Sequence, residues 1–157
     1  MRNLKLVPAA VVLLGALGCS GETVAPPADL SGTWNFTFNT ANADAGATCV
    51  GTMTFTISQT DQTFVGFQRG AGAVSCTGIA LALVSPNPSN ATEFDNEMIG
   101  TGVVGQSDVV FTLNTLNGSN TGTVLKGGQM SGTSSWQLPV SPRGSITVRG
   151  TFTAVKQ

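Results

Sequence analysis

The sequence predicts an all-β domain, a small antiparallel up-and-down barrel of about eight to ten strands that follows an N-terminal export segment. Apolar and polar residues alternate in short runs along most of the chain. Beyond the first 30 residues Thr, Val, Phe and Gly are dense and helix formers are scarce. Turn signals separate the runs closely enough for hairpins. Because a meander of this size hides its edges best by closing, we expect a barrel, with a two-sheet sandwich as the alternative.

The length and charge of the chain restrict its class. Its 157 residues suit one domain, and only 10% of them are charged. The formal net charge of −1 becomes about −3 if Arg2 and Lys5 are removed with a leader, since five basic residues then face eight acidic ones. This balance excludes a basic surface for nucleic acid. Histidine and tyrosine are absent from the sequence, so a Ser-His-Asp relay is impossible, and we expect neither an enzyme nor a cofactor.

The N-terminus has the pattern of an export signal. Arg2 and Lys5 precede an uncharged, mostly apolar run from Leu6 to Gly18. This run of thirteen residues is shorter than the roughly 20 that a spanning helix needs. Residues 1–18 are therefore predicted to be a cleaved signal peptide.

A cysteine follows the apolar run directly. The stretch Ala16-Leu17-Gly18-Cys19 resembles the lipobox of bacterial lipoproteins. The resemblance implies that Cys19 is acylated and begins the mature chain, with the lipid bilayer as its partner, since two or three acyl chains anchor stably. The resemblance also implies delivery to the outer membrane of the cell envelope, because the residue after the cysteine is Ser20 and not an aspartate. The alternative is an ordinary cleavage site in a soluble secreted protein.

The residues after the cysteine are predicted to be a spacer. We assign residues 19–29 to the lipidated cysteine and its linker, in which the Pro26-Pro27 pair favours an extended, semi-rigid chain. Residues 30–157 then form the barrel domain. With Cys19 assigned to lipid, Cys49 and Cys76 remain, and an exported compartment favours a disulfide between them. The alternative is a metal site, which lacks histidine.

The first half of the domain begins with the clearest strand. Trp34, Phe36 and Phe38 alternate with threonine and asparagine, which predicts a strand from Gly32 with one face in water. The same alternation recurs around Phe55. Further strands are expected at 64–68 and 74–84. Turn signals lie at 59–62, 69–72 and 85–90.

The second half continues the meander. Val109, Phe111 and Leu113 alternate with polar or smaller neighbours and predict a strand at 108–113. The other expected strands lie at 96–104, 120–125, 129–138 and 146–152. The turn signals between them lie at 105–107, 117–118, 126–128 and 141–144.

The start of the first strand carries a family resemblance. Gly32-Thr33-Trp34 resembles the Gly-x-Trp signature of the lipocalins and the wider calycin superfamily. The resemblance implies a barrel with a ligand cup, in which a basic residue late in the chain packs across the tryptophan and closes the barrel. Arg149 is the first candidate for this closing pair with Trp34, and Lys156 is the second. Such a stacked cation contributes on the order of 1 kcal/mol.

The apolar strand faces leave two functions open. Trp34, Phe36, Phe38, Phe55 and Phe111 either line a cavity for a small hydrophobic ligand or fill the barrel, since eight-stranded barrels permit both. The first function is a lipid-anchored, calycin-like envelope protein with such a ligand. The alternative is a structural or protein-binding surface module with a filled interior, which an exposed apolar patch would favour.

One acidic run has the residue types of a metal site. Glu93, Asp95 and Glu97 alternate, so a strand would place their carboxylates on one face, where calcium could bind. Like charges at this spacing are more typical of a solvated strand face or a protected edge. We therefore expect no metal site.

Overall fold

The computed structural model describes residues 25–79, 91–95, 99–140 and 144–157, and the regular elements within these ranges are all β-strands. They are β1 (Gly32–Asn42), β2 (Ala47–Thr60), β3 (Thr63–Gln68), β4 (Ala71–Thr77), β5 (Ala91–Asp95), β6 (Ile99–Val104), β7 (Asp108–Leu113), β8 (Gly118–Leu125), β9 (Gln129–Pro139) and β10 (Ser145–Lys156). Among these residues no helix is long and apolar enough to cross a membrane. The predicted all-β class is confirmed.

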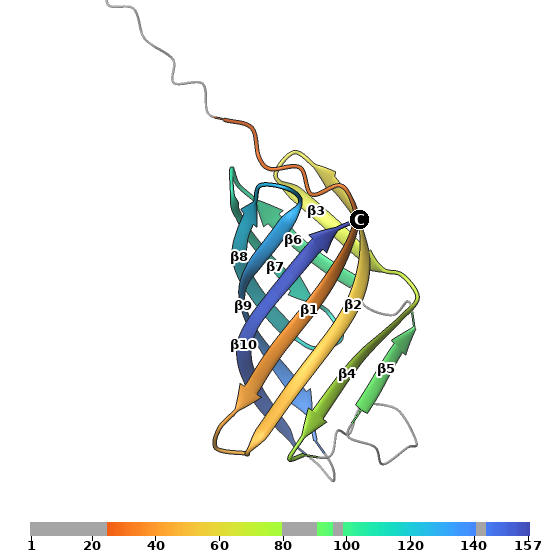
Figure 1. Ribbon diagram of the computed structural model, residues 1–157, viewed down its shortest axis with the longest axis vertical. Coiled ribbons are helices and arrows are strands. Elements are labelled where there is room, and N and C mark those ends of the chain that lie inside the picture. The colour runs from red at the N-terminus through yellow and green to blue at the C-terminus, as the bar shows by residue number, and fades with distance from the viewer. Residues whose placement is uncertain (1–24, 80–90, 96–98, 141–143) are drawn as a thin grey trace, which may run out of the picture.

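The sheet closes into a barrel. Its strands are antiparallel and follow the order β1-β10-β9-β8-β7-β6-β3-β2, and β2 pairs again with β1 (Figure 1). Following the cross-strand partners once round from Ala41 leads back to β1 about ten residues nearer its start, the stagger that tilts strands across a barrel axis. The eight-stranded closure confirms the barrel over the sandwich.

β4 and β5 lengthen the barrel wall at the end away from the N-terminal segment (Figure 1). β2 pairs with β3 through its second half and with β4 through its first half. Thr52 and Phe55 face Ala73 and Gln68, so two residues of β2 lie opposite four, as in a bulge. The turn signal at 69–72 marks a bend at Gly70 (φ 68°) and not a hairpin, because both flanking segments pair with the same strand. The strand predicted at 74–84 ends at Thr77, and residues 80–84 lie outside the described part.

The alternating apolar and polar residues of each strand point to the inside and the outside of the barrel, respectively. Along β7 exposed and buried residues alternate at every position. Threonine is the commonest residue at the exposed strand positions of the described part, and large apolar side chains point inward, where burying each one contributes about 1.5–3 kcal/mol. The largest fully buried side chains are Trp34, Trp136, Phe38, Phe152, Leu30, Leu113, Leu116, Leu138, Val74, Val104 and Val109.

Predicted turns at 59–62, 105–107, 117–118 and 126–128 form as hairpins, and three of them contain residues with positive φ. Asn117 (φ 42°) precedes β8, and Asp61 (φ 52°) lies in the turn between β2 and β3. Gly127 and Gly128, with φ of 85° and 70°, join β8 to β9. These left-handed conformations suit Asn, Asp and Gly, which is why the turn signals at 59–62, 117–118 and 126–128 were informative.

The predicted disulfide is confirmed. Cys49 of β2 and Cys76 of β4 are directly opposite in the sheet, with Cα atoms 4.0 Å apart, and their sulfurs are bonded. Both side chains are buried. The bond links β2 to the part of the wall that lies beyond the bulge.

Some sequence predictions fall outside the described residues. These are the signal peptide at 1–18, the lipidated Cys19 and Glu97. Glu93 and Asp95 belong to the backbone of β5, but the positions of their side chains lie outside the description as well.

Candidate functional site

The barrel interior is occupied by a cluster of aromatic rings. Phe36 lies at its centre, with ring centroids 5.8 Å from Phe38, 5.5 Å from Phe55 and 5.7 Å from Phe111. Phe152 is 6.1 Å from Phe36 and 5.3 Å from Phe111. These separations and the mostly edge-to-face or tilted orientations are those of favourable aromatic pairs. The rings therefore contact one another across the barrel.

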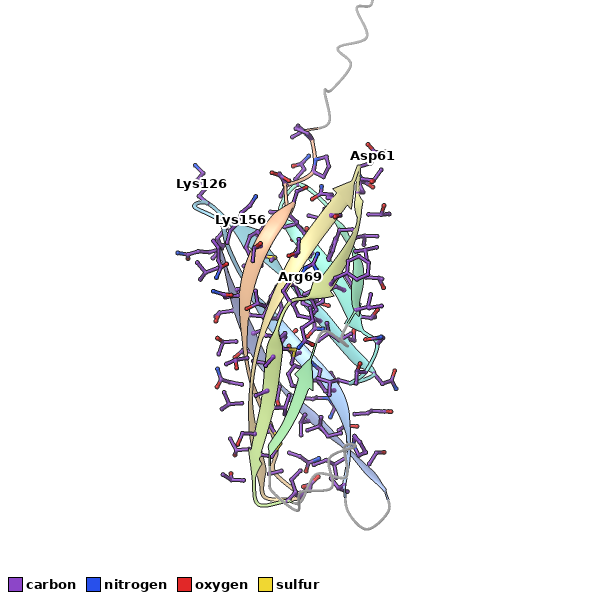
Figure 2. The ribbon with its side chains drawn as sticks, turned by 90° about the vertical axis from the view of Figure 1, so that its right-hand side faces the viewer. Asp61, Arg69, Lys126 and Lys156 are labelled. Atoms are coloured by element: carbon purple, nitrogen blue, oxygen red, sulfur yellow. A yellow bond between two sulfur atoms is a disulfide. The ribbon has the colours of Figure 1, made fainter. Side chains whose placement is uncertain are left out.

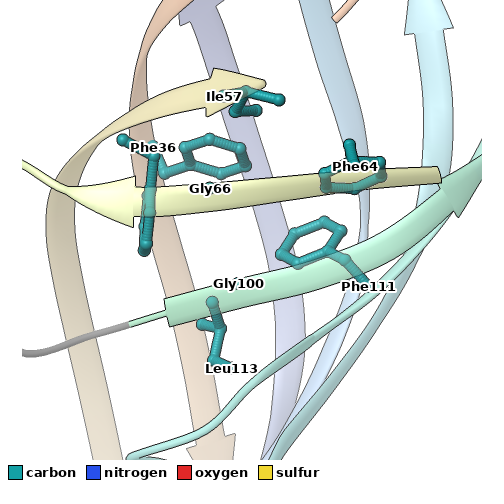
Figure 3. Close-up of a pocket in the computed structure, with 8 residues that line it drawn as sticks. Phe36, Ile57, Phe64, Gly66, Gly100, Phe111 and Leu113 are labelled. Atoms are coloured by element: carbon teal, nitrogen blue, oxygen red, sulfur yellow. The ribbon is translucent and has the colours of Figure 1, made fainter. Parts of the chain in front are cut away.

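Little free space remains between these rings. Figure 3 shows the cavity that they leave, which measures about 10 Å³, roughly enough for one water molecule. Its lining consists of Phe36, Phe55, Ile57, Phe64, Gly66, Gly100, Phe111 and Leu113. The candidates for ligand contact, Trp34, Phe36, Phe38, Phe55 and Phe111, are all buried, and Phe36, Phe55 and Phe111 line this small cavity.

A short polar network lies within the apolar interior. The Ser134 hydroxyl donates to Asn120 Oδ1 at 2.6 Å, and Trp136 Nε1 donates to the same oxygen at 3.4 Å. Asn120 Nδ2 donates to the Phe111 carbonyl at 3.4 Å. Because these groups are paired with one another, the network orients the side chains of β8 and β9, and it contains no titratable group.

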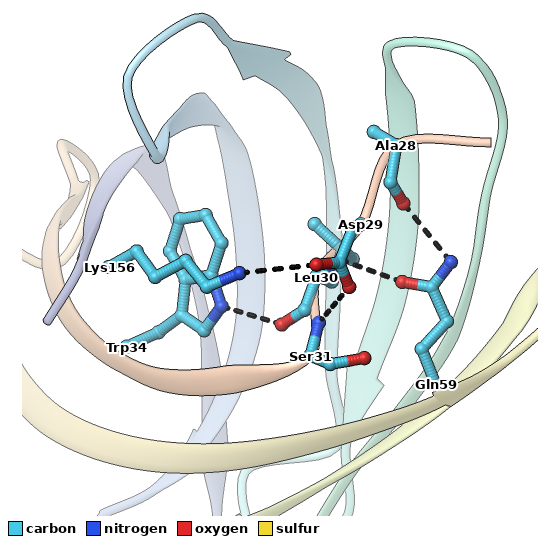
Figure 4. A network of polar contacts seen from close by, with 7 residues as sticks. All are labelled: Ala28, Asp29, Leu30, Ser31, Trp34, Gln59 and Lys156. Carbon is cyan, nitrogen blue, oxygen red and sulfur yellow. Dashed lines mark hydrogen bonds and ion pairs between the residues drawn. The ribbon is translucent and has the colours of Figure 1, made fainter. Parts of the chain in front are cut away.

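The end of the barrel nearest the N-terminus is closed by the segment before β1. Leu30 is fully buried there, and Trp34 Nε1 donates a 2.7 Å hydrogen bond to its carbonyl (Figure 4). Lys156 Nζ lies 5.9 Å from the centroid of the Trp34 ring and 3.5 Å from Asp29 Oδ2. The tryptophan thus joins the N-terminal segment to the last strand.

Gln59 fixes the same segment to β2. Its Oε1 accepts a 2.7 Å hydrogen bond from the Leu30 N–H, and its Nε2 donates to the carbonyls of Ala28 and Asp61 at 3.0 Å and 2.8 Å. The Ala28 N–H donates to the Gly105 carbonyl in the β6–β7 turn at 2.9 Å. Part of the predicted linker, Ala28 and Asp29, is therefore already bound to the barrel (Figure 4).

Arg149, the first candidate for the pair with Trp34, lies elsewhere. It is exposed and faces Ala41 near the far end of β1, whereas the cross-strand partner of Trp34 is Lys156. Trp34 and Ala41 lie at opposite ends of the β1–β10 pairing, so Arg149 is most of the length of β1 away from Trp34. Arg149 instead borders a hydroxyl-lined depression of about 370 Å³ on the outside of β8, β9 and β10. The second candidate, Lys156, takes the closing position.

The carboxylate of Asp29 should make this closure sensitive to acid. The Ser31 N–H donates to it at 2.9 Å and Lys156 adds a nearby positive charge, so the pKa of Asp29 lies below its usual value of 3.8. Because the pKa of Asp29 is lower in the folded protein than in the unfolded chain, its carboxylate stabilises the fold at pH values above 3.8. This contribution is lost as the pH falls through the lowered pKa of the folded state. We expect Asp29→Asn to lower the free energy of unfolding near neutral pH and to converge with the wild type in acid. Denaturant titrations across pH measure this, with the exposed rim residue Asp61→Asn as the control; a constant difference would contradict it.

The labelled charged side chains of the described part lie at separate places on the barrel (Figure 2). Asp61, Lys126 and Lys156 lie toward one end of the barrel, and Arg69 lies further down its side (Figure 2). Among the described residues Lys156 and Asp29 form the one ion pair. No group of three or more His, Cys, Asp or Glu side chains within them could hold a metal ion.

The outside of the barrel carries an apolar patch that the sequence analysis did not identify. We define the outer apolar patch as Val65, Phe67, Ile99, Val103 and Val110 on β3, β6 and β7. Phe67 is 48% exposed, Val103 51%, Val110 43% and Ile99 37%. In the sequence, this patch is indicated by apolar residues at strand positions where other strands carry threonine. That pattern becomes visible only when the structure shows which face of each strand is in water.

Comparison with known proteins finds no matching family model and no significant match to a curated protein or to a solved structure. The site must therefore be interpreted from its own residues.

Proposed function

We propose that this protein is a lipid-anchored component of a bacterial cell envelope, whose solid barrel acts through its outer surface as a structural or protein-binding module. The observation that carries this proposal is the filled interior. A cavity of about 10 Å³ is far below the roughly 300 Å³ at which small-molecule pockets begin. A small hydrophobic ligand inside the barrel is therefore not part of the proposal, and neither is enzyme activity.

Export and anchoring are supported by cysteine chemistry. The buried Cys49–Cys76 bond suits an oxidising compartment, which the charged and apolar leader at 1–18 would supply by export. Cys19 is then the one cysteine left for acylation. The linker after it leads to Ala28, where the chain is already fixed to the barrel.

The filled interior is tested with the mature protein and apolar probes such as a medium-chain fatty acid. Trp34 and Trp136 are fully buried in the interior, so a probe that entered it would change their fluorescence. We expect no saturable change in tryptophan emission and no rise in melting temperature. A saturable change accompanied by a higher melting temperature would show that the barrel opens to a ligand and would overturn the proposal.

Anchoring is tested separately in cells fed a labelled fatty acid. The label is expected on the wild type and is expected to be lost from Cys19→Ser, with the variant released from the membrane fraction. The Cys49→Ala/Cys76→Ala double variant is the matched control and should keep the label. An unlabelled wild type, or a Cys19→Ser variant that keeps the label, would contradict acylation at Cys19.

A further inference from the structure

We propose that the outer apolar patch rests on the surface of the bilayer that holds the lipid anchor, so that the barrel touches the membrane with one defined wall. This inference depends on the proposed anchoring at Cys19. It adds a second contact with the same membrane, which fixes the orientation of the barrel.

The patch is continuous across three strands. Phe67 of β3 is directly opposite Ile99 of β6, and Val103 of β6 is directly opposite Val110 of β7. Val65 lies two positions from Phe67 on the same face of β3. Side chains directly opposite one another are about 4.5–5.5 Å apart at Cβ. The exposed apolar atoms therefore form one surface and not five isolated residues.

The composition of the patch suits an apolar partner. Its water-facing neighbours on β3 and β6 are threonines: Thr63 lies opposite Val103 and Thr101 lies opposite Val65. Among the described side chains of β3, β6 and β7 and the residues next to them, charges border the patch at its ends: Asp108 begins β7, and the exposed Arg69 follows β3. A long arginine side chain at the border of an apolar surface can keep its stem in the apolar layer and its guanidinium among phosphates. Within the described strands, no charge has to be desolvated at the centre of the patch.

The chain leaves the barrel beside this wall. The Ala28 N–H is bonded to the Gly105 carbonyl in the turn between β6 and β7, the two strands that supply Ile99, Val103 and Val110. Eight residues separate Cys19 from Ala28, so the anchor lies at most about 30 Å from this turn. The tether therefore starts at the edge of the apolar wall.

This placement selects the bilayer as the occupant. A short tether holds the barrel at an effective concentration on the order of millimolar relative to the membrane, so even a weak apolar contact is populated. Residue Val155, of similar exposure, lies on β10, four strands from β6 in the eight-stranded order. That opposite wall would face away from the membrane. Its outer surface includes the depression next to Arg149.

The test uses single tryptophan reporters in the lipidated, full mature protein. Phe67→Trp places a reporter in the patch, and Val155→Trp is the matched control on the opposite wall. Each protein is reconstituted into vesicles of phosphatidylethanolamine and phosphatidylglycerol with brominated acyl chains, which quench tryptophan in the apolar layer. Trp34 and Trp136 are fully buried and supply a constant background. We expect quenching and a blue shift for Phe67→Trp alone, and loss of both when Val103→Asn and Val110→Asn are added.

The outcomes separate this inference from the anchoring on which it rests. If every variant floats with the vesicles but neither reporter is quenched, the anchor stands and the patch inference is overturned. Equal quenching of both reporters overturns it as well, because the barrel would then have no preferred wall. If the proteins do not float, anchoring itself fails. A blue shift of Phe67→Trp without vesicles, together with a doubled mass in sedimentation, would show that a second copy covers the patch and would also overturn the inference.

Discussion

Replacing Phe36 with alanine is expected to lower the free energy of unfolding by about 3–5 kcal/mol, the usual cost of removing a buried phenylalanine. The effect should reach the upper part of this range because four other rings pack against Phe36 from β1, β2, β7 and β10. The barrel wall is hydrogen-bonded all round, so it cannot collapse easily into the vacated space. Denaturant unfolding followed by far-ultraviolet circular dichroism measures the difference.

Phe67→Ala is the matched control for this experiment. It removes the same side chain from the outer face of β3, where Phe67 is half exposed, and we expect a loss below about 1 kcal/mol. If Phe36→Ala does not fold, Phe36→Leu keeps most of the volume and should cost about 1 kcal/mol. Equal effects of the two alanine substitutions would show that the interior ring is not packed as described.

The same variant tests the difference between a filled and a hollow barrel. A cavity left by a deleted ring stays dry and can bind benzene-sized molecules. We expect benzene to raise the melting temperature of Phe36→Ala and to leave that of the wild type unchanged. An equal rise for both proteins would indicate that the wild-type interior already has room for a ligand.

The fold was predictable because alternation is a local property of the chain. Trp34, Phe36 and Phe38 share one face by period two alone, and Asn117-Gly118 and Lys126 to Gly128 mark turns by their own conformational preferences. The break between β3 and β4 was not predictable in this way. Its residues look like a hairpin turn, and only the pairing of both segments with β2 makes it a bulge.

The candidate site was less predictable because it depends on register. Arg149 and Lys156 lie on the same strand, and the sequence does not state which of them Trp34 faces. The filling of the barrel depends on how rings from strands far apart in sequence meet, as Phe36 and Phe152 do. The outer apolar patch likewise joins Phe67 to Ile99 and Val103 to Val110 across strands. Such distances and pairings belong to the closed sheet and not to any single segment.

Removing the disulfide with Cys49→Ala/Cys76→Ala is expected to lower the free energy of unfolding by about 3–4 kcal/mol, since the bond closes a loop with a sequence separation of 27 residues. We expect β4 to open locally before the whole barrel unfolds. Beyond the bulge, β4 is held to the barrel by five residue pairs with β2, one of which is the cysteine pair itself. Amide exchange should therefore accelerate in β4, while β9, paired along its length with β10, keeps its protection.

The wild type under reducing conditions is the control that separates the cross-link from the packing of two buried sulfurs. If the cross-link dominates, reduced wild type and the double variant should be destabilised by similar amounts, and the wild type should recover on reoxidation. A much smaller effect of reduction would assign the loss to the cavity that alanine leaves. Uniform acceleration of exchange across β4 and β9 would contradict the local order of opening. In that case the bond would stabilise the barrel as one unit. β4 and β5 would then be joined to β2 as firmly as β3 is joined to β2.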